Sequence, residues 1–257
     1  MKPRISVITA SLNAADRIGD LYDSLAGQTD PDFEWVIADA LSSDGTADML
    51  ATWAAHSPWL KFVSEPDGGI YQAINKAIAR AAGDYYVVAG ADDRFEKEAL
   101  ANYAALAERE RADVVFARVH RGDQIIGGFQ PRKAWIGPSR VFPSSHSVGT
   151  LFRRDLHRRF GWYSSRFPLL ADVYFLKTLL RSGGVRFLTA DFIAGTFAEG
   201  GATTVNQLQL LTENWQVQML TEPYPMLQTA LFLGKILTRF PAVSAELRAH
   251  RKRLAGR

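Results

Sequence analysis

The first 95 residues alternate between short, unbroken apolar runs and longer segments in which apolar residues recur at helical spacing. An unbroken apolar run of about four to eight residues is typical of a strand buried on both faces, and a spacing of three or four is typical of a helix. The pattern therefore predicts an α/β fold in which helices cover both faces of a mostly parallel sheet. The expected strands are 5–10, 34–38, 60–63 and 85–88, and the expected helices are 16–26, 47–55 and 71–81.

Polar residues stand at or beyond the carboxyl end of each of these strands. Ser11 follows the first strand, Asp39 the second and Asp67 the third, and Asp92 with Asp93 follows the fourth. In open parallel sheets, ligands bind outside the carboxyl ends of the strands. The sequence therefore predicts a ligand site along one rim of the sheet.

The second half of the chain is less regular, and no change of composition marks a boundary. We expect an α/β domain over 1–204, divided near residue 95, and a helical extension over 205–257. The expected elements are a hairpin from 114–119 and 124–128, strands at 149–152 and 185–188, and helices at 171–180, 208–220, 226–237 and 242–254.

Composition excludes several classes of protein. The chain has 257 residues, of which 47% are hydrophobic and 22% charged, a balance typical of a folded domain rather than a disordered chain. A net charge of +3 is too small to indicate nucleic-acid binding, and the lack of cysteine excludes disulfides and thiol chemistry. Because neither a signal-peptide pattern nor a run of about 18 apolar residues is seen, a cytoplasmic location is expected.

Adjacent carboxylates at Asp92 and Asp93 are the first candidates for chemistry. Two such groups stay charged and close most readily when a cation lies between them, and a hard divalent ion that bridges diphosphate oxygens would fit. A surface turn that caps a helix starting near Glu96 is the alternative. Asp39 is a candidate to accept hydrogen bonds from a base or ribose, with a local Asx-turn as its alternative.

Asp172 and His146 are the candidates in the second half. Asp172 follows an apolar segment at a predicted helix start, so partial desolvation would raise its pKa toward that of a general base. Simple stabilisation by the helix dipole is the alternative. His146 is a candidate to bind substrate or phosphate, or is merely solvated. No serine-hydrolase elbow, P-loop, dinucleotide fingerprint or metal-binding histidine spacing occurs in the sequence.

These segments, taken in order, resemble family 2 glycosyltransferases of the GT-A fold. The similarity covers 5–13, 35–39 with 42–46, and 65–85, and it ends on the metal-binding DxD-type element at 91–93. In the second half, 146–154, 171–175 and 197–201 are similar to family segments more loosely, nearest the branch that builds colanic acid and capsule. The sequence departs from the family pattern at Ala10, Leu12, Ala40, Leu41 and Thr204.

The resemblance implies an inverting glycosyltransferase of bacterial surface polysaccharide synthesis, with a Rossmann-like nucleotide-sugar-binding half at 1–95 and an acceptor-binding half at 96–204. It implies a glycan or lipid-linked acceptor and a Mn²⁺ or Mg²⁺ ion held by Asp93 and Asp92, with Asp172 as the catalytic base. A sugar nucleotidyltransferase and an inactive, scaffold-like relative are the alternatives. The expected donor-binding residues are Thr9, Ala10, Ser11, Asn13, Asp39, Asp67, Gly68, Lys76 and Asp92, and the expected acceptor-side residues are His146, Arg153, Gly200 and Gly201.

Basic residues gather in two clusters, which are either solvated faces or contacts with the phosphates of a donor, a lipid carrier or a membrane. The second cluster follows a strongly apolar segment at 223–240. One hypothesis for this region is an interfacial helix that makes peripheral membrane contact at a lipid-linked acceptor, and the other is a helical cap packed on the domain or in a homodimer. The clusters are Arg153, Arg154, Arg158 and Arg159, and then Arg248, Arg251, Lys252, Arg253 and Arg257.

Overall fold

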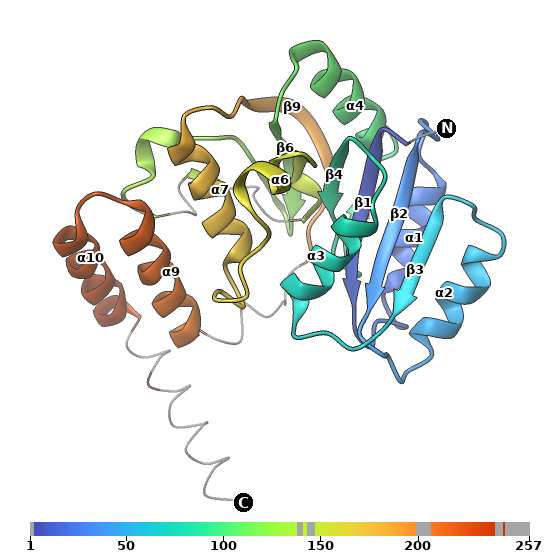
Figure 1. Ribbon diagram of the computed structural model, residues 1–257, viewed down its shortest axis with the longest axis horizontal. Coiled ribbons are helices and arrows are strands. Elements are labelled where there is room, and N and C mark those ends of the chain that lie inside the picture. Colours follow the sequence, from blue (N-terminus) through green and yellow to red (C-terminus); the bar gives the residue numbers. More distant parts are fainter. Residues whose placement is uncertain (1–2, 138–140, 143–146, 199–206, 240–243, 245–257) are drawn as a thin grey trace, which may run out of the picture.

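The computed structural model describes residues 3–137, 141–142, 147–198, 207–239 and 244. Four parallel strands form the first part of its sheet, as the apolar runs predict: β1 (Ile5–Ser11), β2 (Phe33–Asp39), β3 (Leu60–Ser64) and β4 (Tyr85–Val88). Their spatial order is β3-β2-β1-β4 (Figure 1). Ser11 is in register with Asp39, and Asp39 with Ser64, so these polar residues share the carboxyl edge of the sheet.

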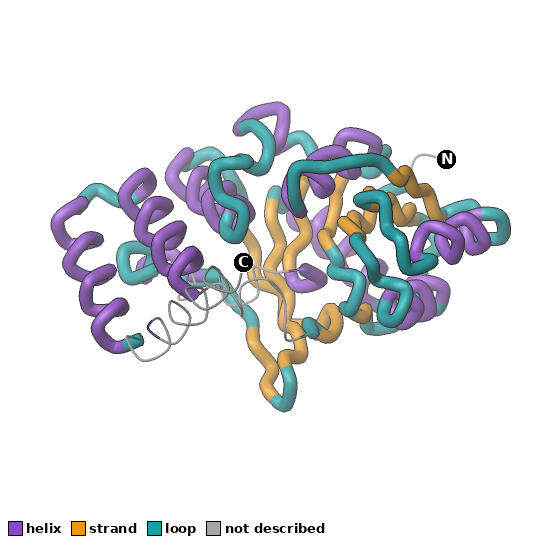
Figure 2. Tube along the Cα trace, turned by 90° about the horizontal axis from the view of Figure 1, so that it is seen from below, coloured by secondary structure: helices purple, strands orange, loops and turns teal. Residues whose placement is uncertain are grey.

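The sheet continues through the second half of the chain with mixed strand directions. Strand β8 (Thr150–Arg153) is antiparallel to both β4 and β6 (Val114–Arg121), and β9 (Phe187–Thr196) is parallel to β6. The short β5 (Arg94–Phe95) pairs with β9, and β7 (Gln124–Ile126) forms the predicted hairpin with β6. Figure 2 shows this sheet as a twisted band with helices around it.

Helices cover the sheet on both sides because successive strand residues face opposite cores. Val7, Trp35 and Val87 lie in the core that includes residues of α1 (Ile18–Ala26), α2 (Thr46–Ala54) and α4 (Ala99–Glu110). Ile8 and Val36, the next residues of β1 and β2, lie in the opposite core with α3 (Ile70–Arg80), α6 (Leu156–Phe160) and α7 (Ala171–Ser182).

The C-terminal region forms two helices, as predicted. Helix α9 (Gln207–Thr221) lies beside α7, and α10 (Pro225–Thr238) lies beside α9 (Figure 1). Val217 of α9 is fully buried in the same core as Ile8, so α9 is packed into the α/β domain. The helix predicted at 242–254 lies almost entirely outside the described residues. The proposed division at residue 204 stays a prediction.

Two elements differ from the sequence-based expectation. Helix α4 is not among the expected helices. It buries mainly small residues, Ala99, Ala104 and Ala107 beside Leu100 and Tyr103, so its apolar stripe is weak in the sequence. Strand β9 extends to Thr196, well beyond the predicted 185–188. Pairing with β6 along most of its length supplies the hydrogen bonds that extend β9 past its apolar start.

Candidate active site

A cavity lies at the carboxyl edge of the sheet, where the polar strand ends predict a ligand site. Its walls come from segments far apart in the sequence: Ala10 at the end of β1, Tyr71 of α3, Asp92 and Asp93 after β4, and Asp172 of α7. Phe197 and Ala198, which follow β9, also line it. The described structure therefore brings the candidate metal ligands and the candidate base to one cavity.

Asp93 is held below the surface of this cavity, whereas Asp92 is exposed. Asp93 is 1% exposed, and its carboxylate accepts hydrogen bonds from the Gly90 amide at 2.6 Å and the Ala198 amide at 3.1 Å. A Cβ added at Gly90 would lie 2.8 Å from Asp92 Oδ1 and 3.0 Å from Asp93 Oδ2. Both carboxylates thus lie over a glycine whose missing side chain makes room for them.

The assignment of these two carboxylates as metal ligands stays a prediction. Within the described ranges, no three His, Cys, Asp or Glu side chains come together in a cluster that would hold a metal. Mg²⁺ is commonly bound by one or two carboxylates, with substrate phosphates and water completing its shell. The oxygen donors and the open side of Asp92 fit a cation of this kind.

Asp172 faces the same cavity from the first turn of α7. The Tyr71 hydroxyl donates to Asp172 Oδ1 at 2.6 Å and also lies 3.2 Å from the carbonyl oxygen of Leu169. Burial, together with the charge of Asp172, raises the pKa of Tyr71 well above its ordinary value. Tyr71 therefore keeps its proton and stays a hydrogen-bond donor to the carboxylate.

Tyr163 lines the cavity and ends a buried chain of hydrogen bonds. His157 Nδ1 lies 3.0 Å from the Gly161 carbonyl, which can only accept, so in the neutral ring this nitrogen carries the proton. Nε2 then accepts from the Tyr86 hydroxyl at 2.7 Å, and Tyr86 in turn accepts from Tyr163 at 2.8 Å. Burial lowers the pKa of His157 to about 4, which keeps the ring neutral near pH 7.

Asp39 lies under the donor-side loops and does not line the cavity itself. Its carboxylate is 1% exposed and accepts from the Ser11, Ser42 and Ser64 hydroxyls and from the Ser42 amide. Burial alone would raise the pKa of Asp39, but these hydrogen bonds outweigh it and lower the pKa. Asp39 is an ionised group that joins three strand ends, and its contact with a base or ribose stays a prediction.

Two other donor candidates make structural hydrogen bonds, Thr9 within the sheet and Asn13 between loops. Thr9 is buried and accepts from the Trp35 indole at 2.9 Å. The Asn13 side-chain oxygen accepts from the Ser43 amide at 2.9 Å, and Asn13 adopts a φ of 49°. An asparagine is among the few residues that tolerate this left-handed conformation. Thr9 thus ties β1 to β2, whereas Asn13 ties the loop after β1 to the loop after β2.

A second cavity adjoins the first on the donor side. Ala10, Ser11, Asp67 and Asp92 line it, together with Arg17, a residue that the sequence analysis did not single out. Asp67 accepts from the Gly69 amide at 2.8 Å, where Gly69 has a φ of +115° at the start of α3. Glycine adopts a positive φ without steric cost, so a glycine just before α3 is the sequence signal of this turn.

The remaining sequence candidates are not all at the rim. Gly68 donates its amide to Gln72, and Lys76 is paired with Glu65 at 3.1 Å and donates to the Pro66 carbonyl, so Lys76 lines neither cavity. The structure does not bring Arg153 to the site. Because β8 runs antiparallel to β4, Arg153 lies opposite Tyr85 at the amino edge and pairs with Asp113 at 3.0 Å. His146, Gly200 and Gly201 lie outside the described residues.

Comparison with known proteins decides the family. The sequence profile of glycosyl transferase family 2 matches residues 6–194, which contain every carboxylate named above. The chain belongs to glycosyl transferase family 2. This family 2 glycosyltransferase is 33% identical over 178 residues to a PGL/p-HBAD biosynthesis glycosyltransferase of Mycobacterium tuberculosis, a match covering 66% of this chain and 67% of the relative. It is 39% identical over 100 residues to the glycosyltransferase TuaG of Bacillus subtilis, named for teichuronic acid biosynthesis, over 38% and 40% of the two chains.

Solved structures agree with the fold of this glycosyltransferase. TarS 1–349 of S. aureus in complex with UDP-GlcNAc superposes with a TM-score of 0.66 at 19% identity, over 91% of this chain and 73% of that one. The mannosyltransferase PcManGT of Pyrobaculum calidifontis, in complex with GDP-Man and Mn²⁺, gives a TM-score of 0.67 at 21% identity, over 98% and 76%. These structures confirm the predicted GT-A fold, and the family match confirms the glycosyltransferase class.

Proposed function

We propose that this glycosyltransferase transfers a sugar, with inversion, from a nucleoside diphosphate sugar to an acceptor hydroxyl during synthesis of a bacterial surface glycan. The observation that carries the proposal is that Asp92, Asp93 and Asp172 line one cavity at the carboxyl edge of the sheet. The relatives are named for teichuronic acid and PGL/p-HBAD biosynthesis, and the solved neighbours hold UDP-GlcNAc or GDP-Man, which supports this class of donor and pathway.

Asp93 and Asp92 would hold a divalent cation, Mn²⁺ or Mg²⁺. The ion would offset the negative charge that develops on the departing nucleoside diphosphate. Mn²⁺ in the PcManGT complex and the two carboxylates over Gly90 support this assignment. Hydrogen bonds from the Gly90 and Ala198 amides fix the Asp93 carboxylate before any ligand binds, so little reorganisation is needed on binding.

Asp172 would accept the proton of the acceptor hydroxyl. As that proton moves to the carboxylate, the hydroxyl oxygen forms a bond to the anomeric carbon, and the bond from that carbon to the diphosphate oxygen breaks. A single displacement of this kind inverts the anomeric carbon and needs no covalent enzyme intermediate. Tyr71 would keep the carboxylate oriented, because its hydroxyl donates to Oδ1.

The donor-side cavity would hold the nucleotide part of the donor. Ser11, Asp67 and Arg17 border this cavity, and Arg17 would add positive charge beside the phosphates. Asp39 would reach a base or ribose only after one of its serine partners released a carboxylate oxygen, so we propose a supporting role for it first.

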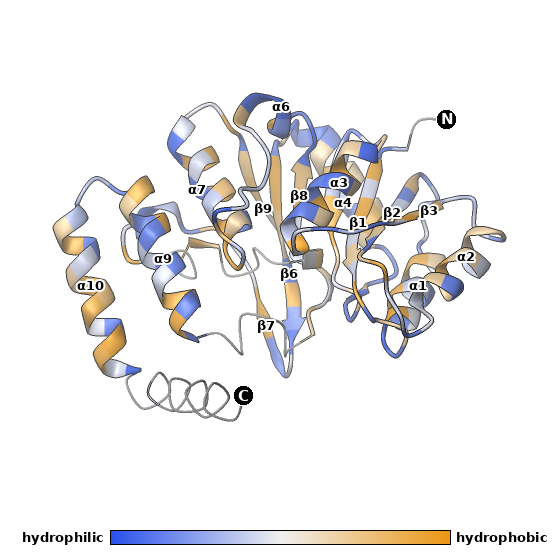
Figure 3. Ribbon diagram, turned by 60° about the horizontal axis from the view of Figure 1, so that its bottom comes forward, coloured by the Kyte–Doolittle hydropathy of each residue, from blue (hydrophilic) through white to orange (hydrophobic). Residues whose placement is uncertain are grey.

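For the acceptor we propose a lipid-linked glycan reached by peripheral contact with a membrane. None of the described helices is long and apolar enough to cross a membrane. Helix α10, largely hydrophobic in Figure 3, exposes Met226, Leu227, Leu233 and Leu237, of which Met226 is 87% exposed. Flotation with anionic liposomes tests this proposal. Failure to bind at low salt would contradict it, and dimerisation without lipid would assign the same face to a homodimer.

The experiment that tests the function is a thermal-shift panel of UDP, GDP, dTDP and CDP, each with and without Mn²⁺. We expect one nucleotide to raise the melting temperature in a Mn²⁺-dependent way, and Asp93→Asn to lose that effect. Asp48→Asn, an exposed carboxylate on α2, is the matched control and should behave as wild type. Release of inorganic pyrophosphate from a sugar phosphate and a nucleoside triphosphate would instead support the nucleotidyltransferase alternative.

A further inference from the structure

Helix α7, which carries Asp172, begins without a capping side chain of its own. Its N-cap residue is Leu170, whose side chain makes no capping hydrogen bond. The amides of Leu169 and Leu170 donate instead to Glu213 Oε2, at 2.9 and 3.0 Å. Glu213 belongs to α9, so the start of the base-bearing helix is capped by a different helix more than forty residues away.

Glu213 is a buried carboxylate that reaches the start of α7. It is 5% exposed, and its second oxygen accepts from the Gln209 amide group at 2.8 Å. The first amides at the N-terminus of a helix have no partner within the helix, so an acceptor from elsewhere can satisfy them. Glu213 accepts from the amide of the N-cap residue and from the amide just before it, and both of its oxygens therefore have hydrogen-bond partners.

The segment that Glu213 holds also contacts Tyr71, the hydrogen-bond partner of Asp172. The Leu169 amide donates to Glu213, and the Leu169 carbonyl oxygen lies 3.2 Å from the Tyr71 hydroxyl, which donates to Asp172 Oδ1. A shift of residues 169–170 would therefore move both a partner of Tyr71 and the first turn that carries Asp172. Glu213, Leu169, Tyr71 and Asp172 form a continuous line of contacts from α9 to the cavity.

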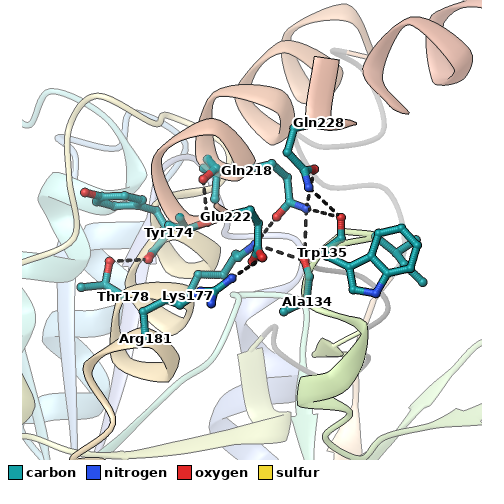
Figure 4. A network of polar contacts seen from close by, with 12 residues as sticks. Ala134, Trp135, Tyr174, Lys177, Thr178, Arg181, Gln218, Glu222 and Gln228 are labelled. Carbon is teal, nitrogen blue, oxygen red and sulfur yellow. Dashed lines mark hydrogen bonds and ion pairs between the residues drawn. The ribbon is translucent and has the colours of Figure 1, made fainter. Parts of the chain in front are cut away.

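A second set of contacts fixes the far end of α7 against α9 (Figure 4). Lys177, which is fully buried, pairs with Glu222 at 2.6 Å and also donates to Gln218. Arg181 pairs with the same Glu222. Burial lowers the pKa of Lys177 to about 8, against the opposing effect of Glu222. Helix α9 thus holds α7 both at its N-terminal turn and along its length.

We infer that Glu213 is a positioning residue for Asp172, so that one side chain of the C-terminal helix α9 orients the base. The inference rests on the proposed role of Asp172 as the base. Displacement of a reacting group by about 1 Å can lower a rate on the order of 10²-fold, so loss of this cap affects turnover more than donor binding. The start of α7 therefore has its hydrogen-bond acceptor only when Glu213 of α9 is packed against it.

Hydrolysis of the nucleotide sugar selected by the thermal-shift panel is a suitable assay, because water then takes the place of the acceptor. We compare Glu213→Ala, Glu213→Gln and Val217→Ala, with Asp172→Asn as reference. Glu213→Ala should lower kcat by about 10- to 100-fold while the KM for the donor changes less than about twofold. Glu213→Gln retains an acceptor oxygen and should recover most of the rate.

Val217→Ala is the matched control, because Val217 is fully buried one turn further along α9 and its side chain cannot accept a hydrogen bond from the Leu169 or Leu170 amide. It should lower the melting temperature and leave kcat near wild type. Hydrogen exchange at the Leu169 and Leu170 amides should accelerate in Glu213→Ala alone. Equal loss of kcat in Val217→Ala and Glu213→Ala, or full activity of Glu213→Ala, would overturn the inference. If Asp172→Asn remains active, the proposed function has failed instead.

Discussion

The donor side and the base side of the active site are held together in different ways. On the donor side, Asp39 joins the ends of three neighbouring strands, and its partners Ser11, Ser42 and Ser64 all lie on or beside those strands. On the base side, Asp172 depends on Tyr71, which is 101 residues away in the sequence. The α7 turn beneath it depends on Glu213 of α9.

This difference shows which structural features position the donor side and which position Asp172. The carboxyl edge of a parallel sheet collects polar residues as a direct consequence of strand direction, so a donor site arises from topology. The proposed base needs a correct distance to that site, and here its position depends on contacts of α7 with α3 and α9. We therefore expect donor-side changes to affect binding and base-side changes to affect turnover.

The largest expected effect comes from Asp172→Asn. Loss of the general base should lower kcat by a factor on the order of 10²–10⁴, while the KM for the donor and the nucleotide-induced thermal shift barely change. Steady-state hydrolysis or transfer kinetics, with a thermal-shift titration on the same preparation, measure both. Collapse of donor affinity would show that Asp172 binds the donor and would break the contrast between the two sides.

The next expected effect is a pH dependence of stability that comes from His157. The pKa of this buried ring is about 4, below its ordinary value of 6.5. Between these pH values the unfolded chain binds a proton that the folded chain does not, so stability rises with pH across the window. As the pH falls from about 6.5 to 4, roughly 3 kcal/mol of unfolding free energy should be lost from this group.

Urea unfolding at several pH values measures this effect. His157→Gln should flatten the pH dependence between 4 and 6.5, whereas His56→Gln, at an exposed histidine, should leave it unchanged. An identical slope in wild type and His157→Gln would show that the Tyr163–Tyr86–His157 chain does not hold a neutral ring.

Much of the donor side could be predicted from the sequence because its signals are local. The strand ends that carry Ser11, Asp39 and Asp92 follow unbroken apolar runs, and the parallel order of those strands follows from the helices between them. The sequence also placed Asp172 at a helix start correctly. It did not reveal that Asp39 is covered by serines, since this depends on loop geometry at three strand ends.

The base side was less predictable because its contacts join distant segments. No spacing within 205–221 distinguishes Glu213 from a solvated glutamate, and only the packing of α9 on α7 brings it to Leu169. Arg153 was placed at the acceptor side through a resemblance, but the antiparallel direction of β8 carries it to the opposite edge. Strand direction in the second half has no local signal of the kind that helices give between parallel strands.

Asp39→Asn should have an intermediate effect, on the donor side. In the native protein the Ser11, Ser42 and Ser64 hydroxyls donate to the Asp39 carboxylate. The asparagine amide keeps one acceptor oxygen but replaces the other with a donor group. Each hydrogen bond to a charged group is worth about 1.5–3 kcal/mol. We expect stability to fall by about 2 kcal/mol and nucleotide binding to weaken. Denaturant unfolding and thermal-shift titrations check this, with Asp48→Asn as control. A loss of kcat at saturating donor would contradict the division between the sides.

The smallest expected effect, from Tyr71→Phe, sharpens the comparison most, because Tyr71 lies in the donor half by sequence and acts on the base. The change removes one hydroxyl that donates to Asp172 Oδ1 and lies near the Leu169 carbonyl, and it leaves the ring that packs on Tyr163. A hydrogen bond to a charged group of about 1.5 kcal/mol corresponds to roughly a tenfold loss of kcat, with little change in the KM for the donor. Tyr224→Phe, at an exposed tyrosine, is the control. If Tyr71→Phe weakened nucleotide binding and spared kcat, α3 would belong to the donor side in function as well as in sequence.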